Sequence, residues 1–179
     1  MKSGYEQLPS PLENVSGLNV SGNNHSDDLF MFIKKKISGF EPNTGYQLRF
    51  EITFATNAPS ECMGVGGPPG EGVAVKAGAT VLEPLSYDDG SESYLMNIDK
   101  GNQISGGSDA ITIGDFANTK KCEDGDFAYE LKTLSNEGNT FTVYTESDGE
   151  LWVLFGTDSG FEAVTSIYYV SGAIVATKM

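Results

Sequence analysis

The sequence is poor in basic residues and in the residues of common catalytic centres. Its 179 residues include one arginine and one histidine, and 11 lysine or arginine residues stand against 25 aspartate or glutamate residues. The net charge of −14 argues against a nucleic-acid partner, because phosphate groups are bound by lysine and arginine. With His25 as its only histidine, the chain has no pattern typical of a Ser–His or Cys–His nucleophile. We therefore expect a protein that is not an enzyme.

Long apolar runs are lacking as well. No window approaches the ~20 apolar residues that cross a membrane as a helix, so we expect no membrane span. No apolar segment follows Met1–Gly4, as it would in a signal peptide. We interpret residues 1–14 as an irregular N-terminal segment whose natural leader has been removed, and a lipid anchor on the full-length precursor fits this interpretation. Length and a hydrophobic content of 39% predict one domain over residues 1–179.

Helical periodicity is nearly absent, whereas strand patterns are frequent. Tyr46–Phe54 alternates apolar and polar side chains, which is typical of a strand with one buried face. The runs Phe141–Tyr144 and Leu151–Phe155 flank an Asp148–Gly149 pair, which indicates a hairpin. We expect an all-β fold, a single-domain antiparallel β-sandwich of the jelly-roll type with about 9–11 strands and long glycine-rich loops.

The two cysteines, Cys62 and Cys122, both lie in loop-like sequence. A disulfide between them would stabilise the fold by about 4 kcal/mol, and two free thiols are the alternative. The bond would tie the loop over residues 57–72 to the loop over residues 114–126. Because disulfides form in oxidising compartments, this pairing predicts a secreted or cell-envelope protein, in the periplasm or on the outer surface.

Two resemblances agree with an exported sandwich. Ser38–Tyr46, with a turn set by Pro42 and Asn43, resembles segments of fibronectin type III domains and of jelly-roll carbohydrate-binding modules with a galactose-binding-like pattern. The chain is about twice the length of a fibronectin type III domain, which favours the jelly roll. The wider pattern resembles a family of uncharacterised bacterial secreted proteins and lipoproteins, through Ser21–Phe32, Gly66–Ala79, Asn97–Gln103 and Gly156–Glu162. This resemblance implies export and carries over no catalytic residue.

Acidic residues gather in the predicted loops, where carboxylate oxygens could bind a structural calcium ion. In jelly-roll carbohydrate-binding modules such an ion ties an early loop to the last strands. By that analogy the candidate ligands are Asp27, Asp28, Asp158 and Glu162, and no cofactor is otherwise required. Solvated acids that confer solubility are the alternative. Paired carboxylates could also serve a glycoside hydrolase, which is a less favoured possibility.

Sugar binding needs aromatic rings for the pyranose faces and polar side chains for the hydroxyls. The candidates are Trp152, Tyr168, Tyr94, Asn102 and Gln103. Trp152 faces outward if Leu151 and Val153 face the core, and it is a core residue if both faces of its strand are buried. We predict an exported, non-catalytic binding module whose partner is a carbohydrate. The alternative is a structural or adhesive protein that binds an envelope protein.

Overall fold

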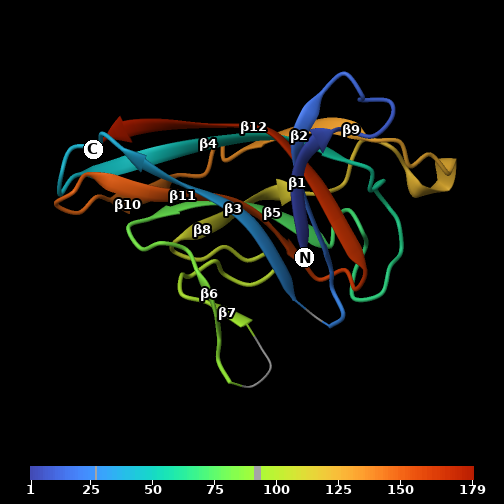
Figure 1. Cartoon of the computed structure of the whole chain (residues 1–179), viewed down its shortest axis with the longest axis horizontal. Helices are drawn as coiled ribbons and strands as arrows, with labels where there is room; N and C mark the ends of the chain where they lie inside the picture. Colours follow the sequence, from blue (N-terminus) through green and yellow to red (C-terminus); the bar gives the residue numbers. More distant parts are fainter. Residues whose placement is uncertain (27, 91–93) are drawn as a thin grey trace.

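Strands make up almost all of the regular structure. A computed structural model describes residues 1–26, 28–90 and 94–179 (Figure 1). In these residues the chain forms twelve strands and one short 3-10 helix, Cys122–Asp124. The strands are β1 (Lys2–Gln7), β2 (Ser16–Asn23), β3 (Leu29–Ser38), β4 (Gly45–Thr56), β5 (Val73–Thr80), β6 (Ser86–Asp88), β7 (Tyr94–Met96), β8 (Ala110–Asp115), β9 (Glu130–Ser135), β10 (Phe141–Tyr144), β11 (Glu150–Ser159) and β12 (Val164–Lys178).

The main strands form two sheets with antiparallel pairing throughout. One sheet has the order β1-β2-β12-β4, with β9 and β10 both beside β4, and the other has the order β3-β11-β5-β8. The strands β6 and β7 form a separate hairpin. Apart from β1 and this hairpin, the first strand lies beside the last and the chain crosses between the sheets as in a jelly roll. The predicted β-sandwich is therefore confirmed, with one strand more than the upper estimate.

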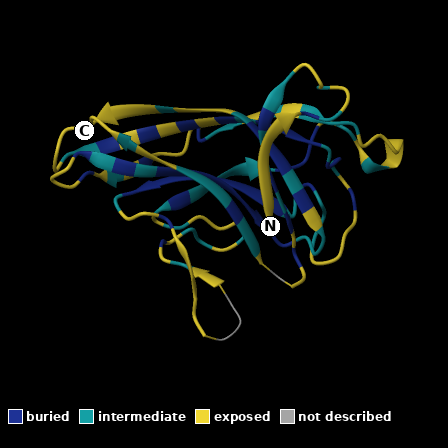
Figure 2. Cartoon of the chain, viewed as in Figure 1, coloured by how far each residue is buried: buried dark blue, intermediate teal, exposed yellow. Residues whose placement is uncertain are grey.

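The core lies between the two sheets. In β4 the side chains of Leu48, Phe50, Ile52 and Phe54 are buried, as the alternating sequence predicts. The ring of Phe50 meets Phe155 of the opposite sheet edge-on, with 6.1 Å between the ring centroids. Figure 2 shows that the buried residues concentrate on β4, β5 and β11, whereas β1 and the β6–β7 hairpin are exposed.

A side chain fills the break between β9 and β10. Phe50 N donates a hydrogen bond to Asn136 Oδ1 at 2.7 Å, and Asn136 Nδ2 donates to Leu48 O at 3.1 Å. The amide group thus satisfies the backbone of β4 where the neighbouring strand is interrupted. As a result β9 and β10 act as the two halves of one jelly-roll strand.

The corner before β4 is formed by the Ser38–Tyr46 segment that the sequence analysis singled out. The hydroxyl of Tyr46 accepts a hydrogen bond from Glu41 N at 2.9 Å, and its ring packs edge-on against Phe40 with 5.1 Å between centroids. A tyrosine that bonds to the backbone a few residues upstream fixes the corner of many β-sandwiches.

The N-terminal segment corrects one expectation. Residues 1–14 were expected to be irregular, but Lys2–Gln7 forms β1 and pairs with β2 at the edge of its sheet. All six side chains of β1 are exposed, so the segment has no alternating apolar pattern that the sequence could reveal. Backbone pairing with β2 forms the strand instead.

No helix in the described ranges 1–26, 28–90 and 94–179 is long and apolar enough to cross a lipid bilayer.

Candidate functional site

The outer face of the four-stranded sheet carries the candidate site around Trp152. In β11 the side chains of Leu151 and Val153 are buried in the core, so Trp152 points away from it and is half-buried. Its neighbours across the sheet are Lys36 on β3 and Thr80 on β5. The outward orientation, one of the two possibilities that the sequence left open, is therefore the one observed.

Two lysines lie over the indole ring. Lys34 Nζ is 5.4 Å and Lys36 Nζ is 6.0 Å from the ring centroid, within the range of cation–π interactions. Lys36 also pairs with Glu150, and Lys34 Nζ lies 2.8 Å from Glu83 Oε1. An aromatic surface is thus surrounded by donors and acceptors that are held in place by ion pairs. The sequence analysis missed these lysines, although their alternating positions already put them on one face of β3.

Farther along β11 the same face is covered by the chain between β7 and β8. Leu154 packs in a small buried cluster with Ile98 and Ala110, against which Phe30 and Phe32 also pack. Leu154 is therefore covered, whereas Trp152, two residues earlier on the same face of β11, is only half-buried.

Asp158, at the far end of β11, holds a buried group of charges. Its carboxylate lies 3.3 Å from Lys76 Nζ and 2.8 Å from Lys100 Nζ, and the side chains of Asp158 and Lys76 are both 0% exposed. Lys76 Nζ also donates to Lys100 O at 2.6 Å and to Ser105 O at 2.8 Å. Burial lowers the pKa of Lys76, because it disfavours the charged form. These contacts fasten the loop over residues 97–109 to the sheet.

Asp28 lies beside Asp158, and the pKa values of the two carboxyls shift in opposite directions. Burial and the neighbouring Asp158 carboxyl raise the pKa of Asp28 to about 6, against the opposing charge of Lys100. Burial alone would raise the pKa of Asp158 too, but hydrogen bonds from Asp28 and Lys100 and the charges of Lys100 and Lys76 keep it below its usual value. The two carboxyls share one cation, because Lys100 Nζ lies 3.4 Å from Asp28 Oδ2 and 2.8 Å from Asp158 Oδ2.

The residues predicted to bind calcium are only partly brought together. Asp28 and Asp158 are neighbours, but the cations between and beside them are Lys76 and Lys100. Glu162 lies elsewhere, next to the glycine-rich loop, where its N–H donates to Val65 O at 2.8 Å. Asp27 lies outside the described residues. Among the described residues no group of three or more His, Cys, Asp or Glu side chains could hold a metal ion, so calcium stays a prediction.

The predicted polar sugar ligands do not join Trp152. Asn102 pairs with Ser105 in a tight turn, and a Cβ atom at Gly160 would lie 3.3 Å from Gln103 Nε2. Both residues are therefore near the Asp158 end of β11, whereas Trp152 is six residues away from Asp158, or about 20 Å along the strand.

The two predicted tyrosines belong to other strands than Trp152, Tyr168 to β12 and Tyr94 to β7. Tyr168 is buried under the N-terminal segment, where it packs with Leu8 and stacks edge-on with Tyr129 at 5.5 Å between centroids. It therefore cannot form part of a surface platform, which corrects the sequence prediction. Tyr94, on the β6–β7 hairpin, is 74% exposed.

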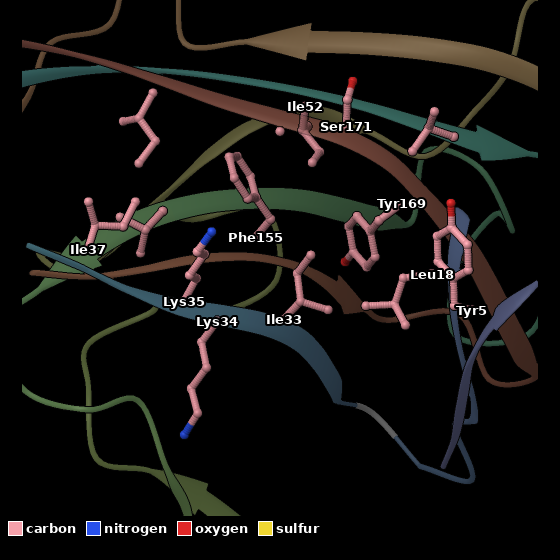
Figure 3. A pocket seen from close by; sticks show the side chains of 14 residues that line it. Tyr5, Leu18, Ile33, Lys34, Lys35, Ile37, Ile52, Phe155, Tyr169 and Ser171 are labelled. Atoms are coloured by element: carbon pink, nitrogen blue, oxygen red, sulfur yellow. The ribbon is translucent and has the colours of Figure 1, made fainter. Parts of the chain in front are cut away.

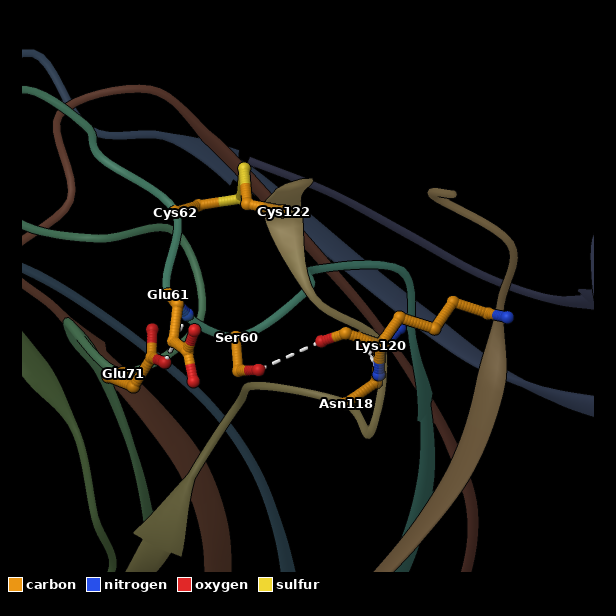
Figure 4. Close-up of a disulfide and its surroundings, with 7 residues drawn as sticks. All are labelled: Ser60, Glu61, Cys62, Glu71, Asn118, Lys120 and Cys122. Atoms are coloured by element: carbon orange, nitrogen blue, oxygen red, sulfur yellow. Dashed lines mark hydrogen bonds between the residues drawn. A yellow bond between two sulfur atoms is a disulfide. The ribbon is translucent and has the colours of Figure 1, made fainter. Parts of the chain in front are cut away.

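The predicted disulfide between Cys62 and Cys122 is present (Figure 4). Around it, Ser60 N donates to Lys120 O at 2.8 Å and Cys122 N donates to Ser60 O at 3.0 Å. The bond thus joins the loops over residues 57–72 and 114–126 where their backbones already run side by side. A disulfide of this kind is typical of proteins that fold in an oxidising compartment.

Comparison with known proteins finds little. No family model matches the chain, and no curated protein matches it. Among solved structures it resembles a "putative sugar binding protein" from Bacteroides thetaiotaomicron, with 9% sequence identity and a TM-score of 0.49. The match covers 98% of this chain and 82% of that chain. At such low similarity, the match says nothing of what this chain binds.

Proposed function

We propose that the protein is an exported, non-catalytic module that binds carbohydrate on the outer face of the β3-β11-β5-β8 sheet. The observation that carries the proposal is the half-buried, outward-facing Trp152 between Lys34, Lys36 and Glu150. A sugar ring has an apolar face, which can stack on an indole, and a rim of hydroxyls, which need donors and acceptors at its edge.

The position of Trp152 favours binding for a second reason. Its strand, β11, lies between β3 and β5 in the middle of the sheet, so its backbone is fixed on both sides. A ligand then meets a site that is already ordered, and little conformational entropy is lost on binding. The disulfide supports export to an oxidising compartment, either secreted or in the cell envelope.

A glycan array tests the proposal. We expect wild-type protein to bind at least one glycan class, and we expect Trp152→Ala to lose that binding. The matched control is Tyr144→Ala, because Tyr144 is an aromatic residue that is 66% exposed on β10, in the other sheet. Far-ultraviolet circular dichroism and thermal melts of both variants show whether the fold is kept, because Trp152 is the sole tryptophan and its removal changes the near-ultraviolet signal by itself. No signal above background, or equal binding by Trp152→Ala and wild type, would contradict the proposal.

A further inference from the structure

An apolar groove opens between the two sheets where one of them is incomplete. The strand β2 pairs with β12 only from Val164 to Tyr169, whereas Ser171–Lys178 of β12 pairs with β4 alone. Opposite this uncovered part, β3 is an edge strand that pairs only with β11. The space between the two edges is a groove of about 390 Å³, which is the size of a small-ligand pocket (Figure 3).

The lining of the groove is mostly apolar. Ile33 and Ile37 form the β3 side, Ile174 belongs to the β12 side, and Ile52 and Phe155 belong to the core beneath. Gly172 keeps the groove open, because a Cβ atom there would lie 3.1 Å from Phe155 Cε2 and 3.3 Å from Ile52 Cδ1. Water in such a groove gains few hydrogen bonds, so an apolar ligand can displace it favourably.

Lys35 and Tyr169 each bring a polar group into this mostly apolar lining. Lys35 alternates with Ile33 and Ile37 on the groove side of β3 and is itself exposed, and Figure 3 shows its amine directed into the groove while Lys34 points away. In the described part of the chain, Lys35 forms no ion pair, although acidic residues outnumber basic ones by 25 to 11. The hydroxyl of Tyr169 is buried and has no hydrogen-bond partner among the described residues. In Figure 3 it points from β12 towards Ile33.

We propose that this groove binds one medium-chain carboxylic acid, with its unbranched chain along Ile33, Ile37 and Phe155 and its carboxylate paired with Lys35. Charge complementarity argues for the acid, since an unpaired ammonium group at an apolar groove favours an anionic head with an apolar tail. The limited volume argues for a single chain rather than a membrane surface. The Tyr169 hydroxyl offers a second hydrogen bond to a ligand oxygen that reaches the floor of the groove.

An inward-pointing lysine on an edge strand also discourages pairing with another chain. That role accounts for Lys35 alone. It accounts neither for the volume of the groove nor for the unpartnered hydroxyl of Tyr169. The experiment must therefore distinguish a groove that binds a ligand from an edge strand on which Lys35 only prevents pairing with another chain.

Titration calorimetry with sodium decanoate, 1-decanol and decyltrimethylammonium, all below micelle-forming concentrations, tests the proposal. We expect saturable one-to-one binding of decanoate, weaker binding of decanol and the weakest binding of the cation. Gly172→Val fills the floor of the groove and should abolish binding of all three ligands, at a cost in stability of about 1–3 kcal/mol that urea denaturation measures. Its control is Gly4→Val on β1, where a Cβ atom meets nothing within 4 Å, and this variant should bind like wild type.

Lys35→Met tests the head group. We expect decanoate affinity to fall about tenfold, the value of one charge-assisted hydrogen bond, while decanol affinity is kept. Lys121→Met, which removes a lysine near the disulfide, should bind decanoate like wild type. No saturable binding of decanoate, equal binding of the cation, or unchanged binding by Gly172→Val would each overturn the proposal.

Discussion

The ammonium group of Lys76 lies 3.3 Å from the carboxylate of Asp158, and neither side chain is exposed to solvent. Two ions that leave water lose their hydration, so they must be well paired with each other and with further polar groups. Here Asp158 Oδ2 also accepts from Lys100, and two backbone carbonyls accept from Lys76, whereas Asp158 Oδ1 is buried with no hydrogen-bond partner among the described residues. The pair therefore binds three distant parts of the chain together, and it should be costly to break.

We expect Asp158→Asn to lower the free energy of unfolding by about 3–5 kcal/mol, because the buried ammonium of Lys76 would lose its counter-ion. Urea denaturation measures the change. The control is Glu41→Gln, which removes the exposed ion pair with Lys178 and should cost less than about 1 kcal/mol. Equal stability of the two variants would contradict the assignment of the buried pair.

Asp28 should make stability depend on pH. Its pKa is raised from 3.8 to about 6, so between these values the folded state holds a proton that the unfolded state has lost. Stability from this group is therefore greatest below pH 3.8 and is lost as the pH rises through 6. We expect thermal melts of Asp28→Asn, compared with wild type from pH 4 to 7, to lack this loss. Parallel curves for the two proteins would argue against the raised pKa.

Two buried tyrosines should respond in opposite ways to the loss of their hydroxyls. In Tyr169→Phe an unpartnered hydroxyl is removed, so we expect the free protein to be as stable as wild type or up to about 1 kcal/mol more stable. In Tyr46→Phe the bond from Glu41 N is lost, so we expect a loss of about 1 kcal/mol. Guanidinium denaturation of both variants measures the contrast. A comparable loss in Tyr169→Phe would mean that its hydroxyl has a partner.

The disulfide should contribute to stability mainly by restricting the unfolded chain. Cys62 and Cys122 are separated by 60 residues, and closing a loop of that length corresponds to about 4 kcal/mol. We expect the Cys62→Ser, Cys122→Ser double variant to lose that amount in denaturation under oxidising conditions. Wild type measured with a reductant should match the double variant, and a difference between the two would point to an effect of the serines themselves.

Calcium binding by Asp28 and Asp158 has a direct test. Because Lys76 and Lys100 already neutralise these carboxylates, we expect the melting temperature to be the same in calcium chloride and in a chelator. A rise with calcium that Asp158→Asn abolishes would instead support the sequence prediction of a structural ion.

Much of the fold could be predicted because it depends on local patterns. The alternation of Tyr46–Phe54 reports which side of β4 is buried, and it does so without knowledge of the neighbouring strands. The alternation in Leu151–Phe155 left two directions open for Trp152, and the burial of Leu151 and Val153 in the structure shows that it is the outward one. The disulfide could be predicted because the chain has only two cysteines.

The remaining features depend on which strands become neighbours. Lys76 lies in the apolar run of β5, and only the pairing of β5 with β11 places Asp158 near it. Tyr168 looks like a surface residue until Leu8 and the N-terminal segment fold over it. The groove results from the early end of β2 beside β12, a mismatch of strand lengths that no single segment of sequence encodes.

The amide of Asn136 has a practical consequence for handling this protein. The Asn136 amide supplies the bonds to β4 at the break between β9 and β10 and also donates to Asn139 O at 2.9 Å. The exposed turn over Glu137–Asn139 therefore carries none of the pairing between β4 and its neighbours. A peptide tag or a fluorophore inserted at Gly138 would therefore sit outside the hydrogen-bonded register of both half-strands. This position offers an attachment point for immobilising or labelling the molecule on the sheet opposite Trp152, with the proposed carbohydrate face left free.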